Sequence, residues 1–288
     1  MVYQQTRTLL KKEKLAPKKK LGQNFLLHEH TARRIADVAG IKPTDTIVEI
    51  GVGLGALTRP LAVMADRVIG IEADSGIVRM HQEKGNLPDN VILRHGDILK
   101  TDLTALSEET GGKLKITANL PYSISTPFLF YLIDHFQVIR SAVIMLQKEV
   151  ARRLLAKPGT REYGIPTVML ASCASTELLL HIPPTEFHPQ PKVDSTVIGI
   201  TFEPMPDHVR RLGTFDRRIL AKVVNAAFGQ RRKTLLNSIS SVLTQLNKKQ
   251  LTVLLEQCGI PPSIRAEKLE LEDFIRITKK LQAGTNNA

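Results

Sequence analysis

Asp45-Thr-Ile-Val-Glu-Ile50 and the adjoining Gly51-Val-Gly-Leu-Gly55 form the stretch that decides the fold. The first six residues have the apolar content of a buried β-strand. The glycines allow a tight turn and the close approach of a ligand to the backbone, and an apolar-periodic helix is expected to follow to about Met64. A strand, a glycine loop and a helix N-terminus in this order are typical of a nucleotide-binding βα unit.

Strand and helix patterns alternate on the C-terminal side of this unit, with short loops between them. Further strands are expected at 67–72, 91–94, 113–118 and 141–146, and helices at 31–39, 75–83 and 126–136. Residues 176–181 and 195–202 are expected to add a closing pair of strands. The alternation predicts an α/β fold with a doubly wound, mostly parallel sheet.

A second, helical domain is expected after Pro204-Met-Pro206, which has the composition of a linker. No strand pattern recurs beyond it, and helical periodicity is present at 215–228, 231–245, 248–257 and 270–281. We therefore predict a basic flexible arm at 1–20, a larger α/β domain at 21–204 and a small all-α domain at 207–288.

The composition indicates a polyanionic partner, because the formal net charge is +12 over 288 residues. Nucleic acid is favoured over a membrane, since no basic amphipathic segment has an aromatic face and no apolar run reaches the ~18 residues that span a bilayer. Aromatic residues make up only 5% of the chain. Cys173 and Cys258 have no metal-ligand spacing, which predicts reduced thiols in a cytosol-like compartment.

Basic residues are concentrated in two places. Residues 1–20 contain seven Lys and Arg side chains against Glu13, which indicates a mobile basic arm, with a mitochondrial transit peptide as the alternative. Residues 210–233 contain eight Lys and Arg side chains against Asp216. A charge run is usually a solvated helix face, but this imbalance of sign favours a surface that contacts phosphates.

Asn119-Leu120-Pro121-Tyr122 follows the strand expected at 113–118, and Pro121 ends that strand because it cannot donate to a sheet. The motif thus lies at a carboxyl strand end, where open α/β sheets bind ligands. The Asn119 side-chain oxygen and the Leu120 carbonyl can accept the two hydrogens of an adenine amine, and Tyr122 can stack on a base taken out of its helix. A polar strand end with a Pro turn is the alternative.

The glycine loop fits two cofactors equally well. Gly51, Gly53 and Ala56 satisfy the dinucleotide fingerprint, with Glu72 about 20 residues further on to hold a ribose diol. S-adenosylmethionine needs the same loop and the same acid. Asp97, at the end of the third strand, either accepts a hydrogen bond from the adenine amine or caps a turn.

Seven blocks of the chain together resemble one family. In order they are Gly22-Gln-Asn-Phe-Leu26, Glu49-Ile-Gly-Val-Gly-Leu-Gly-Ala-Leu-Thr58, Glu72, Gly96-Asp97, Asn119-Leu-Pro-Tyr122, Phe187-His-Pro-Gln-Pro-Lys-Val-Asp-Ser195 and Phe228-Gly-Gln-Arg-Arg-Lys-Thr-Leu235. The ordered set is similar to the ribosomal RNA adenine dimethyltransferases that act on the small subunit, and it covers nearly all of the chain after residue 17. The resemblance implies a Rossmann-like class I methyltransferase domain at 21–204 and a helical RNA-docking domain at 207–288.

The resemblance also implies roles for individual residues around the methyl donor. The implied donor-binding residues are Gln23, Asn24, Leu26, Gly51, Gly53, Gly55, Glu72, Asp97 and Asn119. Gln23 and Asn24 would help hold the methionine end. Glu72 would hold the ribose hydroxyls, and Asp97 the adenine.

Further implied roles concern the target base and the RNA. The implied catalytic residues are Asn119, Leu120, Pro121, Tyr122 and Phe187. Phe187 would pack against the target base, with a loop anchor in the core as the alternative. Arg231, Arg232 and Lys233 would contact RNA. Val52 departs from the family, which commonly has Pro there.

Together these observations predict transfer of methyl groups from S-adenosylmethionine to adenine N6 in small-subunit ribosomal RNA. We expect a cytoplasmic monomer that acts on a pre-assembled small subunit and needs neither metal nor membrane; His28 and His30 are expected at the surface. Three alternatives remain at this point. They are a resistance-type methyltransferase of the large subunit, an NAD-linked oxidoreductase, and an RNA-binding assembly or transcription factor without chemistry.

Overall fold

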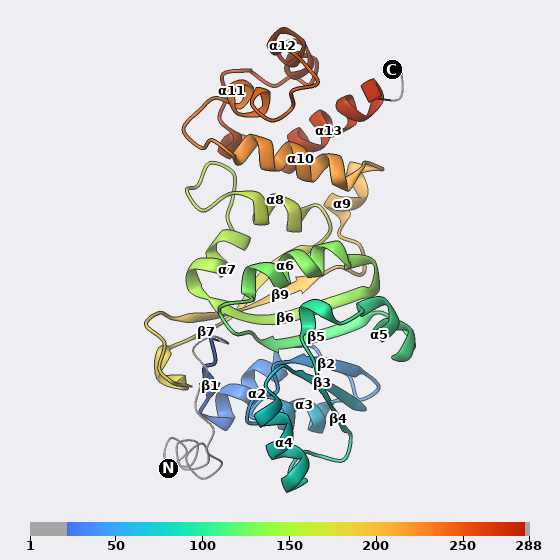
Figure 1. The fold of residues 1–288 in the computed structure, drawn as a ribbon, viewed down its shortest axis with the longest axis vertical. Helices are drawn as coiled ribbons and strands as arrows, with labels where there is room; N and C mark the ends of the chain where they lie inside the picture. Colours follow the sequence, from blue (N-terminus) through green and yellow to red (C-terminus); the bar gives the residue numbers. More distant parts are fainter. Residues whose placement is uncertain (1–21, 286–288) are drawn as a thin grey trace. The chain divides into compact units, whose positions relative to one another are not determined.

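The computed structural model describes residues 22–285, so the predicted basic arm at 1–20 lies outside the described residues (Figure 1). The chain divides into two compact units. The first contains the residues up to Ala151 together with Thr176–Pro204, and the second contains Arg152–Ser175 together with the residues from Met205 onward. Residues 152–175, which the sequence analysis placed in the α/β domain, therefore group with the helical unit.

Within residues 22–285, the first unit contains a seven-stranded sheet of order β4-β3-β2-β5-β6-β9-β7. Its strands are β2 (Thr46–Ile50), β3 (Arg67–Glu72), β4 (Val91–His95), β5 (Leu114–Asn119), β6 (Ile139–Gln147), β7 (Ser175–Ile182) and β9 (Ser195–Thr201). Strands β2 to β6 pair in parallel, and β9 is antiparallel to β6. The predicted doubly wound, mostly parallel sheet is confirmed.

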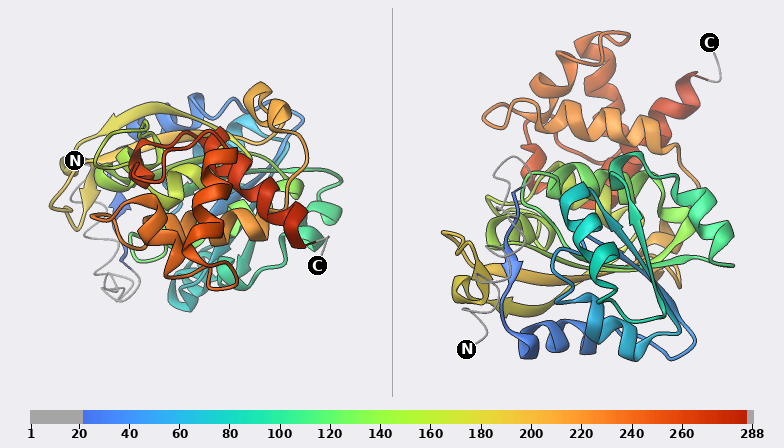
Figure 2. Two further views of the ribbon diagram at one scale, coloured as in Figure 1. Left: turned by 90° about the horizontal axis from the view of Figure 1, so that it is seen from above. Right: turned by 60° about the horizontal axis from the view of Figure 1, so that its bottom comes forward.

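Helices cover both faces of this sheet, with α2 and α3 on one face and α6 on the other (Figure 2). The helices of the first unit are α2 (Glu29–Asp37), α3 (Thr58–Met64), α4 (Ser75–Lys84), α5 (Leu103–Glu109) and α6 (Ser125–Asp134), with short turns η2 (Ile98–Lys100), η3 (Phe136–Val138) and η4 (Pro184–Glu186). The chain runs from β2 outward to β4 and then returns to the other side of β2 at β5. Residues after β2 and β5 therefore flank the switch point of the sheet, where ligands bind in this architecture.

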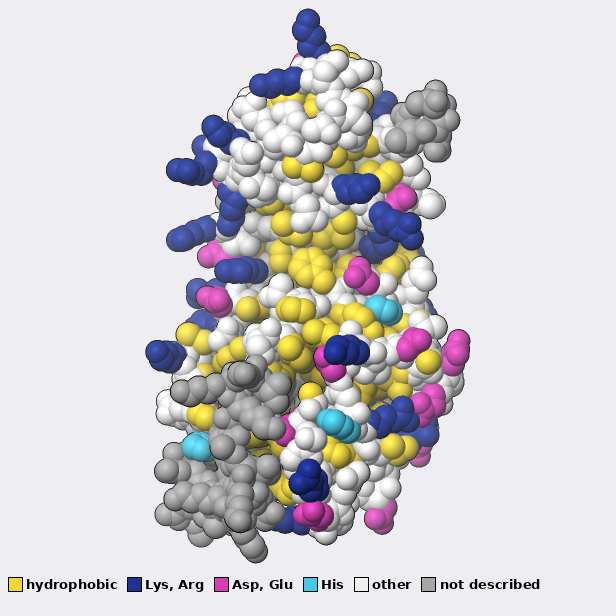
Figure 3. Space-filling model, in the orientation of Figure 1, with side chains coloured by type: hydrophobic (Ala, Val, Ile, Leu, Met, Phe, Trp, Pro, Cys, Tyr) yellow, Lys and Arg dark blue, Asp and Glu magenta, His cyan; other side chains and the backbone are white. Residues whose placement is uncertain are grey.

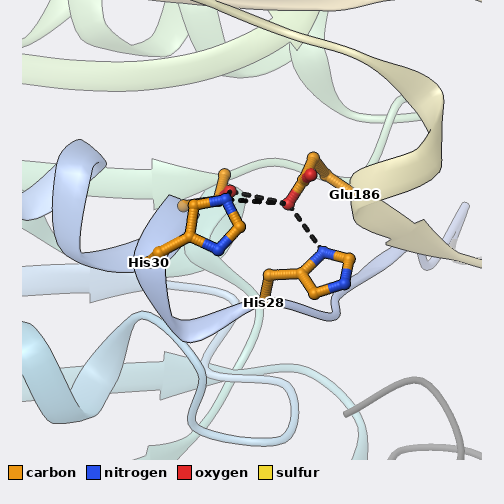
Figure 4. Close-up of polar contacts among 4 residues, drawn as sticks. His28, His30 and Glu186 are labelled. Atoms are coloured by element: carbon orange, nitrogen blue, oxygen red, sulfur yellow. Dashed lines mark hydrogen bonds and ion pairs between the residues drawn. The ribbon is translucent and has the colours of Figure 1, made fainter. Parts of the chain in front are cut away.

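A small two-stranded ribbon joins the N-terminal segment to the Pro-rich loop. β1 (Phe25–Leu26) pairs antiparallel with β8 (Phe187–His188). Beside it the Glu186 carboxylate accepts hydrogen bonds from His28 Nδ1 at 2.8 Å and from the Thr31 hydroxyl at 2.6 Å (Figure 4). Burial alone would raise the pKa of Glu186, but the hydrogen bonds from Thr31 and His28 outweigh it and lower the pKa. His30 is exposed as predicted, and His28, whose side chain is 34% exposed, also lies at the surface, where its bond to Glu186 holds it.

The second unit contains helices and no strand apart from the first residue of β7, within the described residues. Its helices are α8 (Ile165–Ala171), α9 (Asp207–Leu212), α10 (Arg217–Phe228), α11 (Leu235–Ser240), α12 (Lys248–Gln257) and α13 (Leu271–Thr285), with the turn η5 (Ala266–Lys268); α7 (Lys148–Leu154) crosses between the units. Phe228 stacks on Phe274 at 5.8 Å between ring centroids, and Tyr163 packs edge-on against Phe228. The predicted all-α domain is confirmed in class.

One helix of the second unit is shorter than its periodicity predicted. The pattern at 231–245 forms a helix only over Leu235–Ser240. Thr234 adopts an extended conformation and its hydroxyl accepts from the Asn237 N–H, so the helix begins there. Residues 229–233 form turns instead, which places the three basic residues of this region outside any helix.

Three general properties complete the description of residues 22–285. None of their helices is long and apolar enough to cross a bilayer. Cys173 and Cys258 are both buried free thiols. No three His, Cys, Asp or Glu side chains in this part of the chain are grouped as metal ligands.

Candidate active site

A cavity of about 450 Å³ lies in the first unit at the carboxyl ends of β2, β3 and β5. Most of the predicted site residues line it, namely Gln23, Asn24, Leu26, Gly51, Gly53, Glu72, Asp97, Asn119, Leu120 and Pro121. Gly55, Tyr122 and Phe187 do not. Ligand cavities commonly have volumes of ~300–1,000 Å³, so this one has the size of a small-molecule site.

The glycine loop after β2 needs glycine at its turns. Gly51, Gly53 and Gly55 have φ angles of 78°, 54° and 80°, which side chains with a Cβ rarely adopt. A Cβ on Gly53 would also lie 3.2 Å from the Phe25 ring. Gly55 closes the turn through its N–H to the Val52 carbonyl at 2.9 Å and lies outside the cavity. Its role is therefore in loop geometry.

Glu72 is held at the end of β3 by the backbone around it. Its Oε2 accepts from the Gly53 N–H at 2.9 Å, and its Oε1 accepts from the Asp74 N–H at 2.8 Å. Burial raises the pKa of the Glu72 carboxyl, although these N–H groups oppose the shift. Each carboxylate oxygen has a further lone pair. The fixed carboxylate is thus able to accept hydrogen bonds from a vicinal diol in the cavity.

Asp97 and Gln23 combine local structural contacts with a place in the cavity wall. Asp97 Oδ1 accepts from the Leu99 N–H at 3.0 Å and caps η2, so the turn-cap interpretation is correct for this oxygen. Gln23 Nε2 donates to Asp74 Oδ2 at 3.1 Å. This bond ties the N-terminal segment to the turn that follows Glu72, on the side of the cavity where the ribose is expected.

The cavity also has an apolar side and one supporting histidine that are not among the predicted site residues. The apolar lining includes Phe25, Leu54, Ile71, Ile77, Ile98 and Ile124. Phe25 and Ile77 pack together as a small cluster with Leu54. His81 is buried on α4, and its Nε2 donates to the Gly53 carbonyl at 2.8 Å. Isolated apolar residues and a lone His carry no site signal in sequence, although Ile98 directly follows Asp97.

Asn119 has a defined orientation at the end of β5. Its Nδ2 lies 3.2 Å from the Asn24 carbonyl oxygen. Because a carbonyl can only accept, the amide nitrogen must face Asn24, and the side-chain oxygen Oδ1 is left to accept a hydrogen from a ligand. This orientation leaves Oδ1 available for the acceptor role, which stays a prediction. It also links Asn119 to the segment that carries Gln23 and Asn24.

Tyr122 is half-buried and anchored through its hydroxyl. Its Oη lies 3.1 Å from Ser195 Oγ, which is fully buried. Burial raises the pKa of the Tyr122 phenol. The residue does not line the cavity described above, so a stacking role would act on a base outside it and stays a prediction.

Phe187 corrects the sequence analysis. Its side chain is 2% exposed and packs in the main apolar cluster of the first unit with Ile35, Leu61 and Val197. A ring buried in this way has no free face for a base, so the core-anchor alternative holds in this structure. Two further residues of the Phe187–Ser195 block have structural contacts, since Asp194 pairs with Lys148 at 2.7 Å and Ser195 anchors Tyr122.

Val52, at the position where the family commonly has Pro, is well packed. It is 3% exposed, and its Cγ2 lies 2.5 Å from where a Cβ on Gly70 would be. The Val side chain therefore fills the space that glycine leaves on β3. This packing gives the loop a contact that the sequence comparison alone did not show.

Basic side chains are spread over the helices of the second unit (Figure 3). Several of them have structural partners. Arg210 pairs with Asp207, and Arg217 donates to the Ser172 hydroxyl and carbonyl at 2.9 and 3.0 Å. Arg232 and Lys233 are exposed, and no acidic side chain among residues 22–285 pairs with either. Fewer side chains are therefore available for the predicted phosphate contact than the charge run of 210–233 contains.

A doubly wound sheet with a glycine loop, an acid at the next strand end and Asn-Leu-Pro-Tyr at the switch point defines a class I methyltransferase that acts on an amine. The chain belongs to the ribosomal RNA adenine dimethylase family, whose model matches residues 15–283. Enzymes of this family use S-adenosylmethionine as methyl donor, which decides between the two cofactors that the glycine loop allowed.

Individual relatives agree with this membership. A ribosomal RNA small subunit methyltransferase A of Desulfotalea psychrophila is 50% identical over 292 residues, covering 99% of this chain and 98% of the relative. A protein of the same name from Magnetococcus marinus is 40% identical over 275 residues, covering 96% and 95%. A dimethyladenosine transferase from Plasmodium falciparum has a TM-score of 0.75 at 26% identity, covering 91% and 98%. The 23S rRNA methyltransferase ErmE, with a TM-score of 0.64 at 22% identity and coverage of 90% and 99%, supports the fold.

The residues present fit S-adenosylmethionine. The cavity offers a held carboxylate for ribose hydroxyls, the Asp97 carboxylate for an adenine amine and apolar side chains for the ring faces. An adenosyl group has ribose hydroxyls, an amine and a flat apolar ring. A cavity of this size with carboxylate acceptors and apolar walls can bind all three.

Replacement of Glu72 tests the donor site. Glu72→Gln keeps the shape and one acceptor oxygen but removes the charge, and it is expected to weaken S-adenosylmethionine binding by ~1.5–3 kcal/mol. Isothermal calorimetry measures the change. Glu83→Gln, on the exposed side of α4, is the matched control and should bind the donor as the wild type does. An unchanged dissociation constant in a folded Glu72→Gln protein would remove Glu72 from the donor site.

Proposed function

We propose that this protein transfers methyl groups from S-adenosylmethionine to the N6 amines of adjacent adenosines near the 3′ end of small-subunit ribosomal RNA. The product is N6,N6-dimethyladenosine, formed during ribosome biogenesis. One observation carries the proposal within the family. The Asn119 amide is anchored by the Asn24 carbonyl at the cavity wall, which leaves its Oδ1 as an acceptor for a base amine.

The protein's own groups contribute orientation and amine activation. The adenine amine is a poor nucleophile, because its lone pair is delocalised into the ring. Hydrogen bonds from its two hydrogens to Asn119 Oδ1 and the Leu120 carbonyl favour a pyramidal nitrogen with a more available lone pair. S-adenosylmethionine supplies, when bound, a methyl group on a positively charged sulfur. On transfer the sulfur would leave as a neutral thioether, and the methylated nitrogen would become positively charged and then lose its proton to water. Because that proton becomes acidic only after methylation, no strongly tuned general base is required, and positioning sets the rate.

We also propose an oligomeric state, a compartment and the state of the substrate. We infer a monomer, because the cavity is complete within one chain. We infer the cytoplasm, because two buried free thiols fit a reducing compartment. A pre-assembled small subunit as substrate fits the basic side chains of the second unit, which can contact RNA phosphates.

The other candidate functions lose support at specific residues. An oxidoreductase has no use for an Asn119 side chain held at the cavity wall with its Oδ1 left as an acceptor. An RNA-binding factor without chemistry has no use for a carboxylate held by two backbone N–H groups in a donor-sized cavity. A resistance-type methyltransferase of the large subunit has the same fold, so the RNA that is methylated must separate it from the proposal.

The test is a methylation assay with purified protein and small subunits from cells that lack this methylation. Wild type with excess donor should convert two adjacent adenosines mainly to dimethyladenosine, measured by mass spectrometry of nuclease digests. Large subunits are the control and should remain unmodified. Methylation of the large subunit alone, or a reaction that stops at monomethyladenosine, would contradict the proposed function.

A further inference from the structure

The segment 155–164 of the second unit, which we call the α7–α8 loop, carries two exposed basic side chains, Lys157 and Arg161. Its backbone is held by a residue of another segment. Arg231 Nη2 donates to the Arg161 carbonyl at 2.5 Å and to the Tyr163 carbonyl at 3.3 Å. The guanidinium predicted to contact RNA is thus bonded to the backbone of the α7–α8 loop.

The α7–α8 loop is also fixed at other points within the unit. The Gly159 N–H donates to the Glu267 carbonyl at 2.6 Å, and the Thr160 hydroxyl donates to the Lys157 carbonyl at 2.7 Å. Tyr163 is 3% exposed and packs against Phe228. The loop therefore has a defined conformation, and Arg231 provides a charged, two-bond attachment at its C-terminal half.

The attachment brings together backbone segments that carry basic side chains. Lys157 and Arg161 come from the α7–α8 loop, and Arg232 and Lys233 follow the residue that holds it. Lys268 also lies at the loop, with its Nζ 3.4 Å from where a Cβ on Gly159 would be. All five are exposed, and none pairs with an acidic side chain within residues 22–285. Clustered cations without counter-ions are suited to a phosphate backbone.

We propose that Arg231 is a positioning residue for the α7–α8 loop, and that Lys157 and Arg161 bind RNA phosphates together with Arg232 and Lys233. The inference rests on the proposed function and refines where the RNA is held. It assigns a binding role to two residues that lie far from the basic stretch of 210–233 in sequence. It also separates Arg231 from its neighbours, because Arg231 acts through the loop.

The first test compares two double variants that each remove two positive charges from the second unit. Lys157→Ala/Arg161→Ala should lower the log–log salt slope of binding to undermethylated small subunits by ~1.5, as expected for two lost phosphate contacts. Lys248→Ala/Lys249→Ala, an exposed pair on α12, is the control and should change the slope much less. Filter-binding titrations from low to moderate salt measure both. Equal slopes for the two variants would overturn the inference.

The second test asks whether Arg231 acts through the loop. Arg231→Lys keeps the charge but replaces the planar fork by a flexible ammonium, so it should lose most of the affinity that Arg231→Ala loses. In the Lys157→Ala/Arg161→Ala background, Arg231→Ala should weaken binding further by less than about twofold, because interacting residues are non-additive. Wild-type affinity for Arg231→Lys, or full additivity, would show direct RNA contact by Arg231 and overturn its positioning role.

Two further measurements separate this inference from the proposed function. Every variant should keep wild-type affinity for S-adenosylmethionine, which shows that the first unit is folded. If wild type dimethylates the subunit while Lys157→Ala/Arg161→Ala binds like its control, only the inference fails. If wild type produces no methylated adenosine, the proposed function itself fails.

Discussion

Asn119→Ala is expected to slow both methyl transfers by ~10²–10³-fold, the size of effect that follows removal of one hydrogen-bonding group aimed at the reacting atoms. The variant loses the Oδ1 acceptor for the adenine amine. It also loses the hydrogen bond from Nδ2 to the Asn24 carbonyl. Single-turnover methylation followed by mass spectrometry measures the rates of both steps.

The donor site should survive this substitution. Glu72 and the glycine loop remain, and the loss of one neutral hydrogen bond costs ~0.5–1.5 kcal/mol, so donor affinity should fall by no more than about tenfold. Asn90→Ala is the matched control, because Asn90 Nδ2 also donates to backbone carbonyls, those of Ala62 and Ala65, at a place that does not line the cavity. An Asn119→Ala protein that methylates at the control rate would contradict the assigned role.

Glu49→Gln is expected to make the protein more stable at alkaline pH. Glu49 on β2 is fully buried, and neither carboxyl oxygen has a hydrogen-bond partner among residues 22–285. Burial raises the pKa of Glu49 to about 8; the nearby Thr58 hydroxyl opposes this rise, and the charge of Glu72 adds to it. The carboxyl is therefore mostly protonated at neutral pH in the folded protein and ionised in the unfolded chain.

The sign of the pH dependence follows from this difference in protons. The ordinary pKa of a Glu carboxyl is 4.5. Between pH 4.5 and about pH 8, the folded state holds a proton that the unfolded state has lost, so stability falls as pH rises through this window. Glu49→Gln removes this pH-dependent loss of stability, because a Gln amide does not ionise. Relative to wild type, its free energy of unfolding should rise on the order of 2–4 kcal/mol between pH 5 and pH 8.5.

Urea unfolding of wild type, Glu49→Gln and the exposed control Glu83→Gln at the two pH values measures this change. Comparing the pH dependence within each variant cancels the pH-independent cost of burying the Gln amide. A parallel loss of stability with pH in all three proteins would contradict the assigned ionisation of Glu49.

Most of the strands, the mostly parallel sheet and most of the cavity could be predicted, because each depends on local signals. The apolar run before Gly51 and the acid at the end of β3 identify themselves by composition and spacing, and parallel strands bring their carboxyl ends to one edge. Phe187 could not be placed, because an aromatic residue in a Pro-rich loop has the same sequence whether it faces a base or the core. Only the packing of Phe187 against Ile35 and Leu61 in the folded protein shows that it faces the core.

Segments with weak periodicity were also beyond prediction. Helices α5, α7 and α8 have seven residues each, and no glycine loop precedes them as one precedes the equally short α3, so their apolar period does not stand out. The apolar residues of α8 pack against α10, and this long-range contact groups residues 152–175 with the helical unit. The role of Arg231 depended likewise on a carbonyl 70 residues earlier in the chain.

The ribbon of β1 and β8 has a consequence for synthesis of the protein on the ribosome. The segment that carries Gln23 and Asn24 is joined through β1 to β8, and His28 beside it is bonded to Glu186, which is made 158 residues later. A growing chain that ends before Glu186 contains the glycine loop and Glu72 but lacks the strand that fixes this wall. The nascent protein therefore completes its donor pocket only after about two thirds of the chain has left the exit tunnel.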